Sequence, residues 1–186
     1  MTSSAPPGLA RLNRLDPAAA AGLLRGVCAA ADWSAAVAAG LPYRDTGALL
    51  AAGDAATAAL SESGLDAAMA GHPQIGRPAP GESASAREQA GMAGAPEALR
   101  ARMLELNLRY QERFGHVFLV CATGLSAAQL LAAIEERLGN TPEVERAIVR
   151  TELGRINRIR LGRLAESADP ADPAEPAEPA EGDASG

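Results

Sequence analysis

Helix-start signals recur along this chain, and they constrain its fold more than any other feature of the sequence. Asp16-Pro17 and Thr141-Pro142 each place a capping side chain before a proline, the residue that the first helical position tolerates best. Asp45 stands in the same way before a run rich in alanine and leucine. Apolar residues then recur every three or four positions, as they do on the buried face of a helix. These signals predict an all-α protein.

Seven to nine helices are expected in a single compact domain. The clearest lie within residues 17–28, 33–39, 46–60, 65–70, 96–114, 127–138 and 142–165. A weak, short helix is expected near Glu88, because Gly91 and Gly94 follow it. Residues 117–122 (VFLVCA) look like a strand by propensity, but no second convincing strand could pair with them. A buried extended connection or a helical turn is therefore preferred for this segment.

The length and the charge distribution separate a folded body from a tail. A chain of 186 residues with 47% hydrophobic content is long enough for one buried core and short for two. Residues 166–186 carry seven acidic side chains, no basic one and nothing large and apolar, so a disordered tail is expected there. The net charge of −6 therefore belongs to the tail, and residues 1–165, the expected domain, are close to neutral.

The residue types in this chain argue against several kinds of catalysis and against a secreted or membrane location. All 17 basic residues are arginines, so neither lysine-anchored pyridoxal phosphate nor lysine-imine catalysis is available. Cys28 and Cys121 lie in apolar surroundings without metal-ligand spacing, which indicates buried thiols in a reducing compartment. The chain shows neither a signal-peptide pattern nor an apolar run of about 20 residues. A cytoplasmic protein with no membrane partner and no metal is expected.

The loop at residues 72–85 is the longest inside the expected domain, and such loops often carry function. His72 stands at its start, where Pro73 disfavours helical backbone for the histidine. Glu88 and Gln89 lie just beyond its far end. These groups can form a small-molecule site, although a histidine before proline is more often a surface turn residue. Ser85 and Glu88 also match a capping box, which is a purely structural alternative.

The last expected helix is rich in arginine, which raises the question of nucleic-acid binding. Its arginines alternate with glutamates and have no interleaved aromatic residues, so a solvated face with one inward arginine is the better interpretation. They are Arg146, Arg150, Arg155, Arg158, Arg160 and Arg163. No nucleic-acid partner is expected.

Five motifs in order resemble one family, the 2-oxo-4-hydroxy-4-carboxy-5-ureidoimidazoline (OHCU) decarboxylases. They are His72-Pro73-x-x-Gly76, Ser85-x-x-Glu88-Gln89-Ala90-Gly91, Leu106-Asn107-x-x-Tyr110-x-x-Arg113-Phe114-Gly115, Arg137-Leu138-Gly139-Asn140 and Ile159-Arg160-Leu161. The third motif runs directly into the apolar segment 117–122. The resemblance covers residues 12–164.

This resemblance implies an all-helical, dimeric, cofactor-free lyase that converts a ureidoimidazoline to (S)-allantoin in urate breakdown. It implies that His72 is the acid-base residue, with Glu88 polarising either the histidine or the substrate hydroxyl. It also implies substrate contacts from the loop and from the apolar segment, whose backbone groups should line the site. These contacts are Pro73, Ser85, Gln89, Val117, Phe118, Leu119, Val120, Cys121, Ala122 and Thr123.

Thr123 departs from the family pattern, because many members carry a substrate-binding arginine at this position. Threonine can donate one hydrogen bond but supplies no charge. Arg113, Arg155 and Arg158 are the candidates to replace that arginine. The alternative from another functional class is an inactive helical interaction module with the same fold, against which the intact His72 counts.

Overall fold

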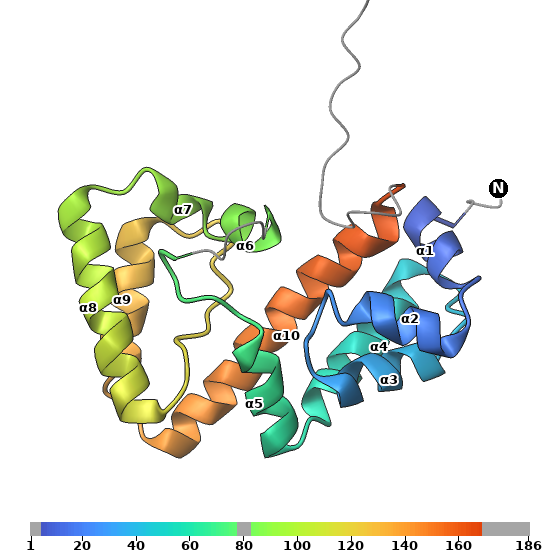
Figure 1. Ribbon diagram of the computed structural model, residues 1–186, viewed down its shortest axis with the longest axis horizontal. Helices are drawn as coiled ribbons and strands as arrows, with labels where there is room; N and C mark the ends of the chain where they lie inside the picture. The colour runs from blue at the N-terminus through green and yellow to red at the C-terminus, as the bar shows by residue number, and fades with distance from the viewer. Residues whose placement is uncertain (1–4, 78–82, 169–186) are drawn as a thin grey trace, which may run out of the picture.

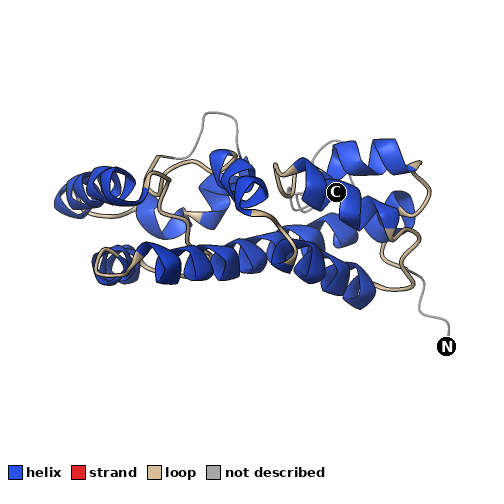
Figure 2. Ribbon diagram, turned by 90° about the horizontal axis from the view of Figure 1, so that it is seen from below, coloured by secondary structure: helices blue, strands red, loops and turns tan. Residues whose placement is uncertain are grey.

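The computed structural model describes residues 5–77 and 83–168, apart from the side chains of residues 83–85. Within these residues the chain forms ten helices and no strand (Figures 1 and 2). The all-α prediction is confirmed, and the expected number of helices was slightly low. The expected tail lies almost entirely outside the described residues.

Five helices form the N-terminal group, and their caps follow the sequence signals. Asp16 accepts a hydrogen bond from the backbone N–H of Ala19, and Asp45 accepts one from Ala48. The short first helix was not predicted, because only its proline marks its start. The group consists of α1 (Pro7–Leu12), α2 (Pro17–Leu24), α3 (Ala31–Ala39), α4 (Thr46–Ala58) and α5 (Glu62–Ala70).

The second helix ends earlier than expected. Residues 25–27 form a tight turn after Leu24, in which the N–H of Gly26 bonds to the carbonyl of Leu23. Glycine weakens a helix by its conformational freedom, so the alanine-rich run does not continue to residue 28.

Five helices follow the loop that begins at His72. They are α6 (Ser83–Glu88), α7 (Ala90–Ala93), α8 (Glu97–Phe114), α9 (Ala127–Arg137) and α10 (Pro142–Glu166). Helix α6 begins two residues before Ser85, so Ser85 lies inside the helix and not at the cap that the capping-box pattern predicted. Helix α8 ends at Gly115, whose φ of +76° favours a residue without a side chain.

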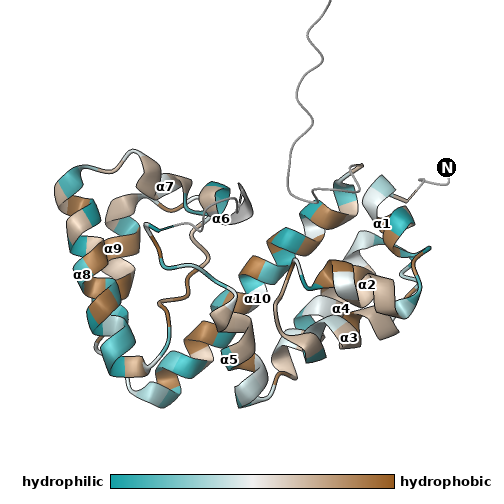
Figure 3. Ribbon diagram, viewed as in Figure 1, coloured by the Kyte–Doolittle hydropathy of each residue, from teal (hydrophilic) through white to brown (hydrophobic). Residues whose placement is uncertain are grey.

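Helix α10 connects the two halves of the molecule. In Figure 1 it runs diagonally, with α1–α4 on one side of it and α6–α9 on the other. It packs against α4 and α1. In Figure 3 its ribbon alternates between brown, apolar stretches and teal, polar ones along its length. The residues expected on its inner face, Val149, Leu153, Ile156 and Leu164, are all buried.

Two hydrophobic cores result. The first core lies among α1–α5 and α10 and contains Trp33, whose indole N–H donates to Gly53 O and Thr57 Oγ1. The second core lies among α7, α8 and α9 around Tyr110. A pocket can form where the two cores meet, because residues of each core line one side of it.

The segment 117–122 joins the two cores. It forms no regular secondary structure, and alternate side chains point to opposite sides, as in any extended chain. Val117, Leu119 and Cys121 pack on the first core, and Phe118, Val120 and Ala122 belong to the second core. The extended connection predicted from the sequence is confirmed, and its apolar composition is explained because both of its faces are covered.

Candidate active site

A narrow pocket opens where α5, α6, α10 and segment 117–122 converge. Its lining combines apolar walls with a few polar groups, as the lining of a small-molecule site does. The lining residues are His72, Pro73, Ile75, Glu88, Gln89, Phe118, Leu119, Val120, Ala122, Ile156 and Arg160. Most of the residues that the family resemblance implied are therefore brought together.

His72 is placed by the end of α5. The helix stops at Gly71, and the backbone N–H of His72 bonds to the carbonyl of Met69. The imidazole is buried, and its Nδ1 lies 2.9 Å from the carbonyl oxygen of Ala68. Because a carbonyl can only accept, Nδ1 must carry a proton, and in the neutral ring the lone pair is then on Nε2. The backbone thus selects the tautomer that can act as a base through Nε2.

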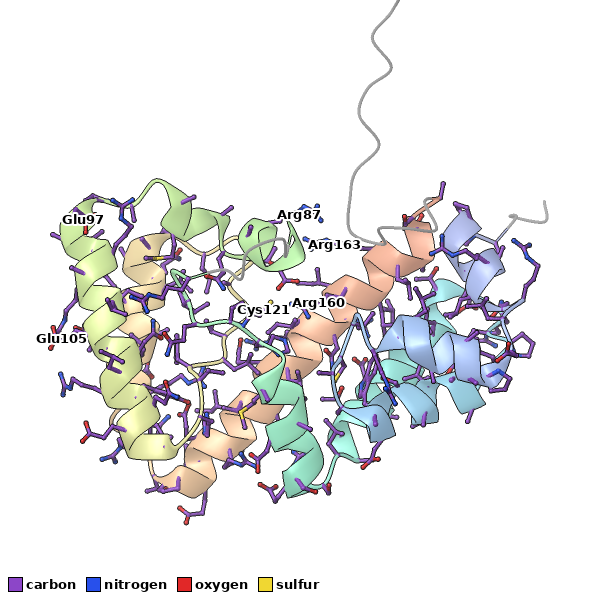
Figure 4. The ribbon with its side chains drawn as sticks, in the orientation of Figure 1. Arg87, Glu97, Glu105, Cys121, Arg160 and Arg163 are labelled. Atoms are coloured by element: carbon purple, nitrogen blue, oxygen red, sulfur yellow. The ribbon has the colours of Figure 1, made fainter. Side chains whose placement is uncertain are left out.

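Glu88 forms a two-pronged ion pair with Arg160. The arginine donates from Nε to Oε1 and from Nη2 to Oε2, each at 2.8 Å, and the two side chains are only 10% and 13% exposed. Figure 4 shows Arg160 extending from α10 toward α6. Arg160 also donates to the carbonyl of Val27, at 3.2 Å. This geometry fixes the direction of the Glu88 carboxylate at the pocket wall.

Gln89 holds the loop that leads away from His72. Its amide oxygen accepts the backbone N–H of Gly76 at 2.8 Å, where φ is +84°. Asn107 of α8 secures the same loop by donating to the carbonyl of Ile75. With its oxygen engaged in this way, Gln89 has its amide NH₂ to offer to a ligand.

Four residues named from the resemblance do not line the pocket or cannot be placed. Val117 and Cys121 face the first core. Thr123 is exposed beyond the end of the segment. The side chain of Ser85 lies outside the described residues. Burial raises the pKa of the Cys121 thiol, and the neighbouring carboxylate of Glu152 raises it further, so this cysteine is a poor nucleophile at neutral pH.

None of the three arginines proposed in place of the missing one reaches the pocket. Arg113 donates to the carbonyl of Asn140. Arg155 and Arg158, which are 64% and 53% exposed, pair with Glu152 and Asp54. Successive residues of an α-helix are turned by about 100°, so these two arginines of α10 point away from the face that bears Arg160.

Arg160 lines the pocket, yet sequence reasoning did not single it out as a site residue. A usable signal was nevertheless present, because Arg160 lies four residues after Ile156 and four before Leu164 on the apolar stripe of α10. An arginine in that register is directed into the protein and needs a partner there.

The described residues contain no group of three histidine, cysteine, aspartate or glutamate side chains arranged to hold a metal ion. Within the same residues, no helix is long and apolar enough to cross a membrane.

Comparison with known proteins identifies relatives by sequence. A 2-oxo-4-hydroxy-4-carboxy-5-ureidoimidazoline decarboxylase of Amia calva is 39% identical over 80 residues, which are 43% of this chain and 46% of that protein. The uric acid degradation bifunctional protein TTL of Arabidopsis thaliana is 34% identical over 102 residues, which are 50% of this chain and 31% of that protein. The matches thus span less than half the length of these curated relatives.

Solved structures show the same fold. A crystal structure of OHCU decarboxylase in the presence of (S)-allantoin superimposes with a TM-score of 0.69 at 23% identity, covering 78% of this chain and 98% of that one. A crystal structure of (S)-allantoin synthase gives 0.64 at 21% identity, covering 87% and 55%. The OHCU decarboxylase family model matches residues 13–162, and the chain therefore belongs to the OHCU decarboxylase family.

Proposed function

We propose that this protein decarboxylates 2-oxo-4-hydroxy-4-carboxy-5-ureidoimidazoline to (S)-allantoin. Family membership supports this activity. The observation that carries the proposal is that His72, Glu88, Gln89 and Arg160, which come from three separate parts of the chain, converge on one pocket.

The chemistry of this substrate matches a site without a lysine. The carboxylate is on a ring carbon that also bears a hydroxyl and adjoins a C=N bond. When the carbon–carboxylate bond breaks and CO2 leaves, its electron pair forms a C=C bond with the ureido-bearing carbon, and the C=N electrons move onto the ring nitrogen, which takes up a proton. The substrate thus supplies its own electron sink. The hydroxyl then gives up its proton as the ring carbonyl forms, and one proton is added to the neighbouring carbon that bears the ureido group. The protein has to bind, orient and move protons.

His72 is the proposed acid-base residue. Its Nδ1–H is fixed on Ala68 O, so Nε2 can take the hydroxyl proton and return a proton to one face of the ring. A proton delivered from one wall of a closed pocket produces a single enantiomer, whereas a proton from water can reach either face.

Arg160 and Gln89 are the proposed binding residues, with Glu88 holding Arg160 in place. The guanidinium is the charged donor that Thr123 does not supply, and it lies in the pocket lining. The amide NH₂ of Gln89 suits the carbonyl oxygens of the ring and the ureido group. The walls contributed by Phe118, Val120 and Ile156 exclude water, which strengthens these contacts.

We further propose that the protein acts as a homodimer in the cytoplasm, with residues 1–165 as the folded unit. Light scattering on the purified chain tests the dimer. A monomer with full turnover would show that the pocket of one chain is sufficient.

The activity is tested with freshly generated product of hydroxyisourate hydrolase. The purified protein is added, and (S)-allantoin is followed by circular dichroism. Optical activity should develop much faster than in the reaction without protein. A signal no faster than that of a matched His72→Gln protein would leave the inactive interaction module as the better description.

A further inference from the structure

The pocket wall formed by segment 117–122 is an irregular chain whose position must be set by other residues. No helix or sheet ladder holds it. Within the described part of the chain, Cys121 is the one residue of this segment whose backbone N–H donates to a hydrogen bond. What this wall can offer a ligand therefore depends on where the backbone is held.

Helix α10 holds this wall through two carboxylates. Glu152 Oε2 accepts the N–H of Cys121 at 2.8 Å. Glu145 acts through Arg137, which donates from Nε and Nη2 to Glu145 Oε1 and from Nη1 to the carbonyl of Leu119 at 2.7 Å. Two neighbouring points of the wall are therefore fixed to one helix.

The same face of α10 also carries the pocket residue Arg160. Glu145, Glu152 and Arg160 are spaced by seven and eight residues, which is about two helical turns each time. Ile156, between the last two, lines the pocket itself. The wall and the Glu88–Arg160 pair consequently share one rigid frame.

Burying the carboxylate of Glu152 at this position costs free energy, so we expect its hydrogen bond to Cys121 to have a role. Its side chain is only 10% exposed, and its two oxygens are divided between the Cys121 amide and Arg155. An apolar residue would suit its neighbours Leu153 and Val149, which are fully buried.

We propose that Glu152 is a positioning residue for the decarboxylation: its carboxylate oxygen sets the register of the backbone of segment 117–122 against the substrate. It touches neither substrate nor reacting atoms. This inference rests on the proposed function. It predicts that the hydrogen-bond acceptor at this position is required, and that the negative charge is not.

Three variants separate these two requirements. Glu152→Ala removes the acceptor and should lower kcat/KM by about 10²-fold, the size of effect that a small misplacement of a site can produce. Glu152→Gln keeps an oxygen at the same reach and should recover to within about tenfold of wild type. Glu152→Asp keeps the charge but is one methylene shorter, and it should remain impaired. An electrostatic role would give the opposite order for Gln and Asp.

Amide exchange provides a measurement that does not depend on activity. Exchange of the Cys121 N–H, measured by NMR, should be fast in Glu152→Ala and Glu152→Asp and slow in Glu152→Gln and wild type. Glu143→Ala, which removes an exposed carboxylate from the same helix, is the matched control and should change neither exchange at Cys121 nor turnover.

The outcomes distinguish the inference from the function on which it rests. If wild type fails to produce allantoin, the proposed function is wrong, and the exchange pattern still decides whether Glu152 holds the wall. If wild type is active and Glu152→Ala matches it, or if Asp recovers activity and Gln does not, the positioning role is wrong. Should the alanine variant fail to fold, the Gln and Asp pair decides alone.

Discussion

Glu88 and Arg160 are 72 positions apart in the chain, yet their side chains meet in two parallel hydrogen bonds of 2.8 Å at the pocket wall. The pair links the short helix α6 to the long helix α10. It therefore joins two elements that line the pocket and fixes the guanidinium of Arg160 in the pocket wall. Its disruption should affect both stability and turnover.

Replacing Arg160 tests this pair directly. Arg160→Ala leaves the buried Glu88 carboxylate without its main partner and should lower the free energy of unfolding by up to about 3 kcal/mol. It should also lower kcat/KM by at least about 10²-fold. Arg160→Lys keeps the charge but loses the two-pronged contact, and it should be intermediate. Denaturant unfolding and steady-state kinetics measure the two effects.

Arg158→Ala is the matched control for Arg160, because it lies on the same helix and pairs with Asp54 at the exposed surface. Its kinetics should resemble wild type. If Arg158→Ala lost more activity than Arg160→Ala, the arginine expected from the sequence would be the correct one.

His72→Gln should fold normally and lose about 10²–10⁴-fold in kcat, the usual contribution of a general acid-base group. His116→Gln is its control, because His116 stacks on Phe114 and bonds to the carbonyl of Val117 outside the pocket lining. Allantoin formation followed by circular dichroism measures both variants. Equal activity of His72→Gln and wild type would remove this histidine from the mechanism.

The acid stability of the protein should depend on Glu145. Burial alone would raise the pKa of this carboxyl, but hydrogen bonds from Arg137, Tyr110 and Asn140 outweigh burial and lower it below its ordinary value of 4.5. The folded state therefore binds fewer protons than the unfolded state between the two pKa values. The stability that Glu145 contributes is complete above about pH 4.5 and is lost as the pH falls through the folded pKa.

Glu145→Gln should consequently unfold at a lower temperature than wild type at pH 6–7, and the difference should shrink as the pH falls below about 4.5. Thermal unfolding followed by circular dichroism between pH 3 and 7 gives the comparison. A difference that stayed constant over this range would mean that the ionised form of Glu145 contributes nothing.

Treatment with a strong chelator should leave turnover unchanged, since the substrate supplies its own electron sink and the described residues offer no metal-binding cluster. The check compares activity before and after dialysis against chelator, and again after adding divalent ions. Activity that returned only with an added ion would contradict the cofactor-free mechanism.

The helices were predictable because their signals are local. A cap at Asp45 or Thr141 and an apolar stripe act over a few residues, and the structure confirms these starts. Helix α7 escaped prediction because its four residues include Gly91, which gives it almost no intrinsic preference. Its formation depends on packing against the rest of the chain, which local patterns do not describe.

His72 could be found from the sequence because histidine is rare in this chain, and Glu88 and Gln89 could be found from the motifs that resemble the family. Two histidines make His72 a visible candidate, whereas seventeen arginines conceal Arg160. What singles it out is a partner on a distant helix, and proximity of that kind arises from tertiary structure. The secondary structure of segment 117–122 could not be decided from its sequence for a related reason. Its apolar composition indicates that both faces are buried, and this holds equally for a strand and for an extended connection between two cores.

The position of α10 also has a consequence for biosynthesis. The N-terminal helices leave the ribosome long before α10, but the first core needs Leu153 and Leu161 of that helix, and the pocket needs Ile156 and Arg160. A nascent chain that has reached only residue 140 contains the residues of the second core, but it has neither a complete first core nor a complete site. Completion of the first core and of the site should therefore arrive together, once α10 has been synthesised.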